Sequence, residues 1–536
     1  MDKQPLLPDN TTERRFRNPS FRRWTFILVL LIIIGAATLR HNLFLPGNNS
    51  ERLSERYEGE LISWEPCVPS NGITTECSKV DVPMDHFNHG ASGNRTFTIP
   101  LIRMRGANAT KNLIINPGGP GMSGIEYLND HGEQLRSIIG EGFHLLSFDP
   151  RGVNKATPLA SCYPDAAARE HFSRVRFRNL EIDSPETYAW TQNFAKACSD
   201  TMGEQAKYIN TPQTAADMNT ILAAVGQEDM FYWGFSYGSL LGQTYAGMFP
   251  ARSKRVIIDG IVNQFKWYNG TFEMESQVDT NRVFYGFLNE CFKAGPVKCP
   301  LSSIATSAEQ LQYIVLSSMK KLREQPLSVY LNQTAYGLLK YENLWYDVVL
   351  PALYSPSTWF TLASHLHQII LGNATDVFLA SGNKDAWDLG HEGSEFIRLN
   401  DGLSGPAYWP QDRQSLLDYM IPLLNGSMFG AIHGKIFFMR QQWNIPRTHH
   451  YMPQKGVKTA HPLLILSTTY DPVCPLVSAH PAQEAFVGSR IVRINGFGHC
   501  STSVNSSCVA KILHNFLYDG SVPETSTECE VDSSYF

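Results

Sequence analysis

The chain has 536 residues, of which 43% are hydrophobic, and a formal net charge of −5 at pH 7. This content is ample for a sizeable core, and the length allows three or four average domains or one large α/β core with insertions. The mildly acidic charge, with no basic stripe in the globular part, gives no reason to expect a nucleic-acid partner.

The N-terminal segment predicts a membrane anchor. Five arginines between positions 14 and 23 precede an uncharged apolar run, residues 24–39. The run is near the lower limit for a membrane span, and the positive side should stay cytoplasmic. We therefore expect a cytoplasmic tail (1–23), a transmembrane signal anchor (24–39) and a luminal stem (40–57) in a single-pass type II membrane protein. The alternative is a signal peptide cleaved near residues 35–37, which would give a secreted protein.

The predicted tail also carries a short sorting pattern. Asp2-Lys3-Gln4-Pro5-Leu6-Leu7 fits the acidic dileucine form D-x-x-x-L-L. On the predicted topology this sequence is cytoplasmic, where a sorting adaptor could bind it and direct the protein to a vacuolar or endosomal membrane. A disordered tail with two incidental leucines is the alternative.

Cysteines and sugar-acceptor triplets predict an oxidising compartment. All ten cysteines follow the predicted anchor, and their even number suits a disulfide framework. Expected pairs are Cys67–Cys77, Cys162–Cys198, Cys291–Cys299, Cys474–Cys500 and Cys508–Cys529, with Cys500–Cys508 as a competing choice. N-x-Ser/Thr triplets, which predict a glycoprotein, begin at Asn48, Asn94, Asn108, Asn269, Asn332, Asn373, Asn425 and Asn505. The cysteines are accompanied by no C-x-x-C pair or zinc-like His cluster, so we expect no metal and no organic cofactor.

A buried strand followed by a Gly-rich loop comes early in the globular part. Residues 111–115 predict the strand, and Asn116-Pro-Gly-Gly-Pro-Gly-Met-Ser-Gly124 the loop. Glycines in such a loop let backbone N–H groups approach a ligand. An ordinary Gly/Pro turn is the alternative.

The pentapeptide Gly234-Phe-Ser-Tyr-Gly238 lies between an apolar run, 230–233, and a helix-like stretch, 239–249. This is the strand–turn–helix setting of a nucleophile elbow, in which the serine side chain is exposed above a sheet. Ser236 is therefore a predicted nucleophile. The oxyanion hole should use the backbone N–H of the next residue, Tyr237, and one from the upstream loop, Gly119.

The C-terminal part supplies an acid and a base in hydrolase order. Asp471 follows a predicted strand, 463–467, and His499 follows another, 490–494, in a glycine-containing loop. A lone loop Asp is usually a turn former and most His residues are not catalytic, but the order Ser, Asp, His after three strands predicts a catalytic triad.

These motifs resemble a known family. Asn116-Pro-Gly-Gly-Pro-Gly121, Phe148-Asp-Pro-Arg-Gly-Val153, Thr214-Ala-Ala-Asp-Met218, the elbow and the two C-terminal loops look like the tripeptidyl aminopeptidase branch of the prolyl-aminopeptidase-type α/β-hydrolases. Pro117 stands where the prolyl enzymes carry His, which agrees with the tripeptidyl branch. The resemblance implies an α/β-hydrolase fold with a mostly parallel sheet and a helical cap. We expect core residues 58–263, a cap at 264–447 and a second core segment at 448–536.

The resemblance also implies a serine exopeptidase that releases short peptides or single residues from free N-termini. Such an enzyme needs a carboxylate for the substrate amine, and Glu273, Glu275 and Asp279 are the candidates, although exposed helix-face charge is an alternative for each. Asp149 and Arg151 are expected to form a structural pair beneath the site. An esterase or thioester hydrolase acting on a small molecule would use the same triad. A non-enzymatic binding ectodomain is a third reading, disfavoured because all catalytic parts are present.

Overall fold

The computed structural model describes residues 55–67, 74–175, 179–381 and 389–536. The dileucine sequence, the apolar run at 24–39 and all but the last three residues of the expected stem lie outside these ranges, and they stay predictions. Within the described ranges, no helix combines the length and the apolar composition that a membrane crossing needs.

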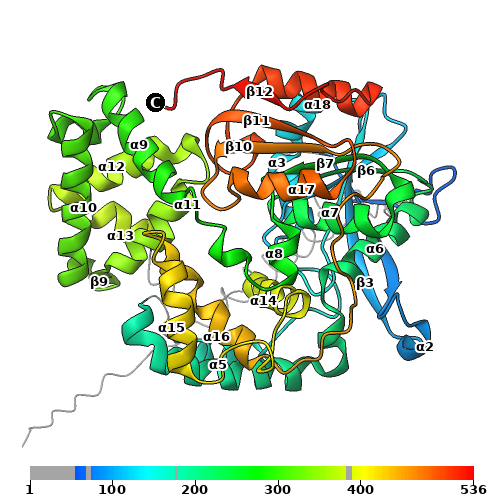
Figure 1. The fold of residues 1–536 in the computed structure, drawn as a ribbon, viewed down its shortest axis with the longest axis horizontal. Coiled ribbons are helices and arrows are strands. Elements are labelled where there is room, and N and C mark those ends of the chain that lie inside the picture. Colours follow the sequence, from blue (N-terminus) through cyan, green and yellow to red (C-terminus); the bar gives the residue numbers. More distant parts are fainter. Residues whose placement is uncertain (1–54, 68–73, 176–178, 382–388) are drawn as a thin grey trace, which may run out of the picture. The chain divides into compact units, whose positions relative to one another are not determined.

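A mixed, mostly parallel sheet forms the centre of the described fold (Figure 1). Its strand order is β1-β2-β3-β5-β4-β6-β7-β10-β11-β12. The pairs β1–β2, β2–β3 and β3–β5 are antiparallel. All pairs from β5 to β12 along this order are parallel. Strand bounds are β1 Glu65–Pro66, β2 Glu76–Pro83, β3 Thr96–Met104, β4 Asn112–Asn116, β5 His144–Phe148, β6 Met230–Phe235, β7 Ser253–Asp259, β10 Leu464–Tyr470, β11 Arg490–Phe497 and β12 Thr527–Glu530.

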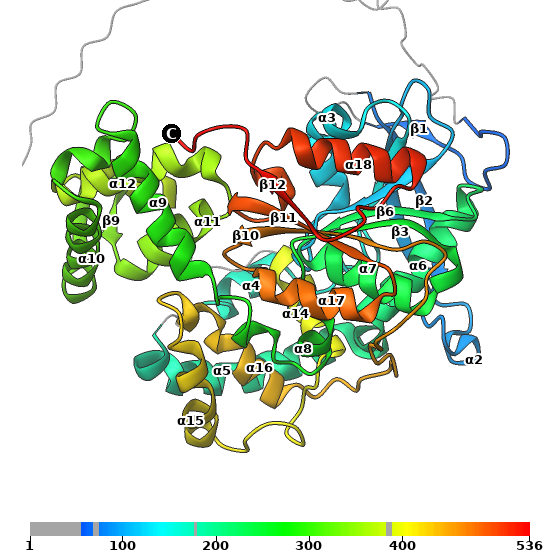
Figure 2. The ribbon, with the colours of Figure 1, turned by 45° about the horizontal axis from the view of Figure 1, so that its top comes forward.

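Helices cover both faces of this sheet (Figure 2). On one face, α3 (Gly124–Ile139) and α18 (Ser507–Asp519) bury apolar residues against β4, β6 and β10. On the other, α6 (Thr211–Ala224), α7 (Tyr237–Met248) and α17 (Ala479–Ala485) join a larger core. Because both faces are covered, the central strands are continuous buried runs; β4, β5 and β6 are buried at every position.

Between β7 and β10 the chain is mainly helical, as expected, and it forms two packing groups. One group surrounds a core of its own; it includes a hairpin, β8 (Leu327–Asn332) with β9 (Ala335–Leu339), and the helices α9 (Thr280–Ala294), α10 (Ala308–Glu324), α11 (Leu350–Ala352), α12 (Trp359–Ile370) and α13 (Thr375–Ser381). The other shares the sheet's larger core and contains α8 (Gln264–Tyr268), α14 (Leu389–Asp401), α15 (Arg413–Leu424) and α16 (Gly434–Gln442).

A helix from before the elbow packs with this second group. α5 (Leu180–Met202) lies beside α15 and α16 in both views (Figures 1 and 2). The ring of Tyr188 lies 5.9 Å from that of Phe438, and Arg413 Nη1 donates to Ser184 Oγ over 2.9 Å. The helical layer is therefore assembled from two separate stretches of chain, and the expected cap, 264–447, contains only one of them. The remaining α-helices of the described residues are the short α2 (His89–Ser92) and α4 (Ala166–Phe172).

The expected pairing of Asp149 with Arg151 is wrong. Arg151 is fully buried and donates from Nε to Asp217 Oδ2 over 2.8 Å, and to the carbonyls of Met84 and Tyr208. Asp149 instead accepts from the Ser123 hydroxyl over 2.6 Å, which fixes the start of α3. Thr214–Met218 belongs to α6, so the helix rather than the adjacent loop supplies the counter-charge to Arg151.

Four of the expected disulfides are confirmed: Cys67–Cys77, Cys162–Cys198, Cys291–Cys299 and Cys508–Cys529. Disulfides of this number indicate a non-cytosolic location. Seven of the eight sugar-acceptor asparagines lie in the described residues, and all seven are exposed, as glycosylation requires; Asn48 lies outside. The expected Cys474–Cys500 bond and its competitor Cys500–Cys508 are wrong, because Cys474 and Cys500 are free and buried.

Candidate functional site

Parallel pairing brings the carboxyl ends of five strands to one edge of the sheet. Asn116 of β4 pairs with Gly234 of β6, and Phe235 of β6 pairs with Asp259 of β7. β10 lies beside β7, and β11 lies beside β10. The residues that follow these strands therefore meet, although they are up to 380 positions apart in sequence.

Ser236 occupies the predicted strained turn. It lies directly between β6 and α7 with φ 55° and ψ −121°, a conformation that L-residues rarely adopt. Its N–H donates to the Asp259 carbonyl over 2.8 Å. Gly234 and Gly238 are needed because backbone passes close to both: a Cβ on Gly238 would lie 2.5 Å from the Asn116 carbonyl oxygen, and one on Gly234 would lie 2.3 Å from the Gly238 carbonyl oxygen.

The Gly-rich loop after β4 lies against this turn. Gly118 and Gly119 have φ values of 104° and 105°, which glycine tolerates. A Cβ on Gly118 would lie 2.9 Å from Ser236 Cβ and 3.0 Å from the Tyr237 nitrogen, so the two segments are in direct contact. Among the described residues, the backbone N–H groups of Gly119 and Tyr237 have no hydrogen-bond acceptor.

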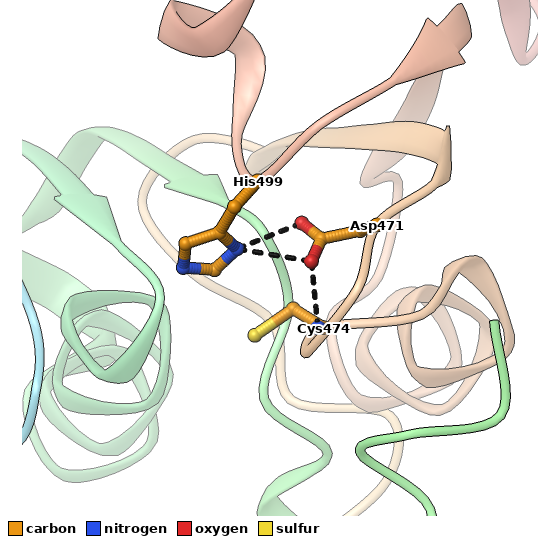
Figure 3. A group of neighbouring side chains, drawn as sticks. All are labelled: Asp471, Cys474 and His499. Carbon is orange, nitrogen blue, oxygen red and sulfur yellow. Dashed lines mark hydrogen bonds and ion pairs between the residues drawn. The ribbon is translucent and has the colours of Figure 1, made fainter. Parts of the chain in front are cut away.

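Asp471 and His499 form a hydrogen-bonded pair (Figure 3). His499 Nδ1 lies 2.9 Å from Asp471 Oδ2 and 3.0 Å from Oδ1. The carboxylate also accepts from the backbone N–H groups of Val473, Cys474 and Cys500 at 2.8–3.1 Å. With only donors around it and no solvent exposure, Asp471 is held as a fixed acceptor. The His499 side chain stays 12% exposed. The backbone N–H of His499 donates to the Tyr354 carbonyl over 2.7 Å.

Gly260 connects the serine turn to this pair. It directly follows Asp259, whose carbonyl accepts the Ser236 N–H. A Cβ on Gly260 would lie 3.4 Å from His499 Cε1 and 3.5 Å from Asp471 Oδ2. Gly260 therefore lies against the Asp471–His499 pair and directly follows the residue that holds the serine turn.

The two free thiols lie at the same place. The Ser236 side chain lies close enough to Cys474 to favour its thiolate, but burial prevails and raises the pKa of the Cys474 thiol well above its usual value. Cys500 Sγ lies 3.7 Å from each ring nitrogen of His499, and burial raises the pKa of this thiol as well. Both thiols are therefore protonated at neutral pH and poorly nucleophilic.

Asp259, at the end of β7, is a buried acid that the sequence analysis did not single out. Its carboxylate accepts from the Ser501 N–H over 2.8 Å and the Ser501 hydroxyl over 2.5 Å. Burial raises its pKa to about 6. One residue thus holds the serine turn through its carbonyl and the histidine loop through its side chain. A polar residue at the carboxyl end of the strand after the elbow is the signal that could have identified it.

The three expected amine-binding carboxylates are each paired with a cation of the protein. Glu273 Oε1 lies 3.0 Å from Arg440 Nη2, Glu275 Oε2 lies 2.7 Å from Lys266 Nζ, and Asp279 Oδ1 lies 2.7 Å from Arg282 Nη1. All three are buried, so the exposed helix-face alternative is wrong. Burial opposes ionisation of Glu273, but Arg440 and Arg398 prevail and lower its pKa. Burial raises the pKa of Asp279, and the Asp471 carboxylate contributes to this shift.

A cavity of about 580 Å³ opens at His499. It is lined by Tyr127, His131, Tyr354, His499 and Tyr535, among others, and by none of the three carboxylates. Its volume lies in the range that holds a small organic ligand or a short peptide.

Comparisons with known proteins agree with this architecture. Residues 111–286 match the family model described as "alpha/beta hydrolase fold", and residues 429–529 match the one described as "TAP-like protein". The first covers the Gly-rich loop and the elbow, and the second covers Asp471 and His499. The chain has an α/β-hydrolase fold, and its sequence is similar to the TAP-like branch of these proteins.

Three curated relatives match this hydrolase over most of its length. Serine protease Hip1 of Mycobacterium tuberculosis (strain H37Rv) is 26% identical over 538 residues, covering 93% of this chain and 98% of that protein. Tripeptidyl aminopeptidase of Streptomyces lividans is 28% identical over 493 residues, covering 87% and 86%. Carboxylesterase B of M. tuberculosis is 25% identical over 490 residues, covering 87% and 89%. The relatives support a serine hydrolase, and their names include both peptidases and an esterase.

Proposed function

We propose that the protein is a serine peptidase in which Ser236, His499 and Asp471 form the catalytic triad. The observation that carries the proposal is the Asp471–His499 hydrogen bond beside a serine in a strained strand–helix turn. Ser236 Oγ attacks the scissile carbonyl while His499 Nε2 takes its proton and then delivers it to the leaving amine. Asp471 keeps the Nδ1 proton on the ring and stabilises the imidazolium. Water then hydrolyses the acyl-enzyme by the same route.

The oxyanion hole is formed by the backbone N–H groups of Gly119 and Tyr237. Two observations support this assignment: both N–H groups lack an acceptor in the described chain, and the Gly118 backbone touches the Ser236 turn. Two N–H donors aimed at the developing oxyanion stabilise the tetrahedral intermediate because they need no reorganisation during the reaction. Glycine at position 118 is required for this contact.

The substrate class is a peptide with a free N-terminus. Relatives named serine protease and tripeptidyl aminopeptidase support peptide cleavage. Of the three carboxylates, Asp279 best suits an amine-binding role, because its charge acts on Asp471 and the adjacent Thr280 hydroxyl donates to the Pro472 carbonyl over 2.6 Å. A substrate ammonium would replace the mostly exposed Arg282 as its partner. Glu275 is less suitable because Asn263, Ser478 and Lys266 already bond its carboxylate. Glu273 is bonded to the buried Arg440, but its Oε2 has no hydrogen-bond partner among the described residues, so it is the second candidate.

A carboxylesterase relative of similar coverage favours a second function, ester or thioester hydrolysis of a small molecule. The two functions share every catalytic group and differ only in what the pocket recognises. A triad is therefore insufficient to choose between them.

One substrate comparison separates the two functions. The purified protein is given a tripeptide amide with a free amine, the same peptide N-acetylated, and a small activated ester. We expect the free peptide to be cleaved with at least about 100-fold higher kcat/KM than the acetylated one, since losing a buried charge-assisted contact costs about 3 kcal/mol. Equal rates for the two peptides would contradict aminopeptidase action, and cleavage of the ester alone would favour the esterase.

For location, the four disulfides support a luminal or extracellular domain. A type II anchor at 24–39 and secretion after cleavage are both compatible with this placement.

A further inference from the structure

Three metal-ligating side chains converge beside the serine turn. Asp471, Cys474 and His499 each offer one ligand atom, and these atoms all lie within 4.8 Å of one another. Figure 3 shows that the three side chains lie together on the loops after β10 and β11, with the Cys474 sulfur below the imidazole in this view. Asp471 and Cys474 are buried, and the imidazole is largely so.

The donor set suits a thiophilic divalent cation. Carboxylate oxygen, thiolate sulfur and imidazole nitrogen are the ligands that Zn²⁺ takes, at about 2.0–2.3 Å and in tetrahedral geometry. The Cys474 thiol, which is protonated in the free protein, releases its proton to solvent as the S–Zn bond forms. Ligand atoms around such an ion are about 3.5 Å apart. The present spacing therefore needs only a small movement of the side chains.

The loops that carry these donors are already fixed. Asp471 Oδ1 accepts from the Cys474 N–H over 2.8 Å, and Oδ2 accepts from the Cys500 N–H over 3.1 Å. The backbone N–H of His499 donates to the Tyr354 carbonyl. Because the backbone is tied in place before any ion arrives, binding costs little ordering.

We propose that Asp471, Cys474 and His499 form a binding site for one Zn²⁺ ion, and that the bound ion reversibly inhibits the hydrolase. The ion would occupy the carboxylate and imidazole that proton transfer requires, so a zinc-loaded chain cannot use His499 as a base. The inhibition rests on the proposed triad, whereas zinc binding itself does not.

Binding is tested without activity, in the full chain carrying Ser236→Ala. Titration of that protein with zinc chloride, followed by calorimetry, should show one high-affinity site. Adding Cys474→Ala should weaken the affinity by more than the 10–100-fold typical of a lost outer-shell partner. Adding Cys500→Ala is the matched control, because Cys500 is also a buried free thiol next to His499 but is not a member of the group; it should leave the site intact. If the alanine variant does not fold, Cys474→Ser replaces it.

Inhibition is tested on the enzyme with Ser236 present, with an activated ester as substrate. Zinc should inhibit the enzyme saturably, and EDTA should restore the rate. The Cys474→Ala variant, compared with its own zinc-free rate, should resist zinc, and Cys500→Ala should not. Equal zinc affinity or equal inhibition with and without Cys474 would overturn the site. A chain that binds zinc through Cys474 but hydrolyses nothing would instead contradict the proposed function and leave the site standing.

Discussion

Replacing Ser236 with alanine should lower kcat by about five to six orders of magnitude while the fold is kept. The hydroxyl is the only atom lost, and Ser236 holds its turn through backbone contacts: its N–H bonds the Asp259 carbonyl, and its own carbonyl accepts from the Ser239 N–H and hydroxyl. Turnover of an activated ester and thermal unfolding of both proteins are the measurements.

The matched control is Ser503→Ala. Ser503 lies in the histidine loop, lines the cavity at His499 and donates to the Cys500 carbonyl over 2.8 Å. It has no role in the proposed proton transfer, so kcat should fall by less than about tenfold. A Ser236→Ala enzyme as active as the Ser503→Ala enzyme would remove Ser236 as the nucleophile.

Asp471→Asn should produce the second-largest loss, about 10⁴-fold in kcat. The His499 ring and the backbone N–H groups of Cys474 and Cys500 all bond the carboxylate oxygens of Asp471. In either orientation of an asparagine side chain, the amide NH₂ would replace one of these acceptor oxygens with a donor. The variant therefore favours the wrong imidazole tautomer and leaves buried donors unpaired, so its free energy of unfolding should also fall, by about 1–3 kcal/mol. Ester turnover and denaturant unfolding give the two values.

Asp279→Asn is the control for that variant, because it removes a nearby buried carboxylate that is not bonded to His499. Ester hydrolysis should change little, whereas cleavage of a peptide with a free amine should weaken if Asp279 binds that amine. An Asp471→Asn protein that stays folded and keeps more than a tenth of its ester activity would exclude Asp471 as the partner of the base.

Local sequence was sufficient for the parts of the site that local chemistry specifies. The strand before Ser236 is apolar throughout, the one before Asp471 begins with the apolar run Leu464–Leu466, and the one before His499 carries buried apolar residues between polar ones; they form β6, β10 and β11. Glycine is required at 234 and 238 because a Cβ at either position would lie within 2.5 Å of a backbone carbonyl oxygen. A sequence pattern can express this constraint. The cysteines that are neighbours in the sequence form the predicted disulfides Cys67–Cys77, Cys162–Cys198 and Cys291–Cys299.

What the sequence did not predict depends on contacts between distant segments. Arg151 pairs with Asp217 of α6 rather than with Asp149, a contact between segments 66 residues apart that nothing local to either residue indicates. Cys474 and Cys500 remain thiols although both lie beside His499, which their order in the sequence does not indicate. α5 joins the helices of the later insertion through residues such as Tyr188, which sequence order assigned to the core.

The central claim, that Ser236 is the nucleophile of an acyl-enzyme mechanism, is tested most directly by covalent labelling. The native protein is treated with a fluorophosphonate, digested and analysed by mass spectrometry. We predict one adduct per chain, on the peptide that contains Gly234-Phe-Ser-Tyr-Gly238, and no adduct in Ser236→Ala or when His499 is replaced by alanine. An adduct on a different residue that persists in the Ser236→Ala protein would contradict the account.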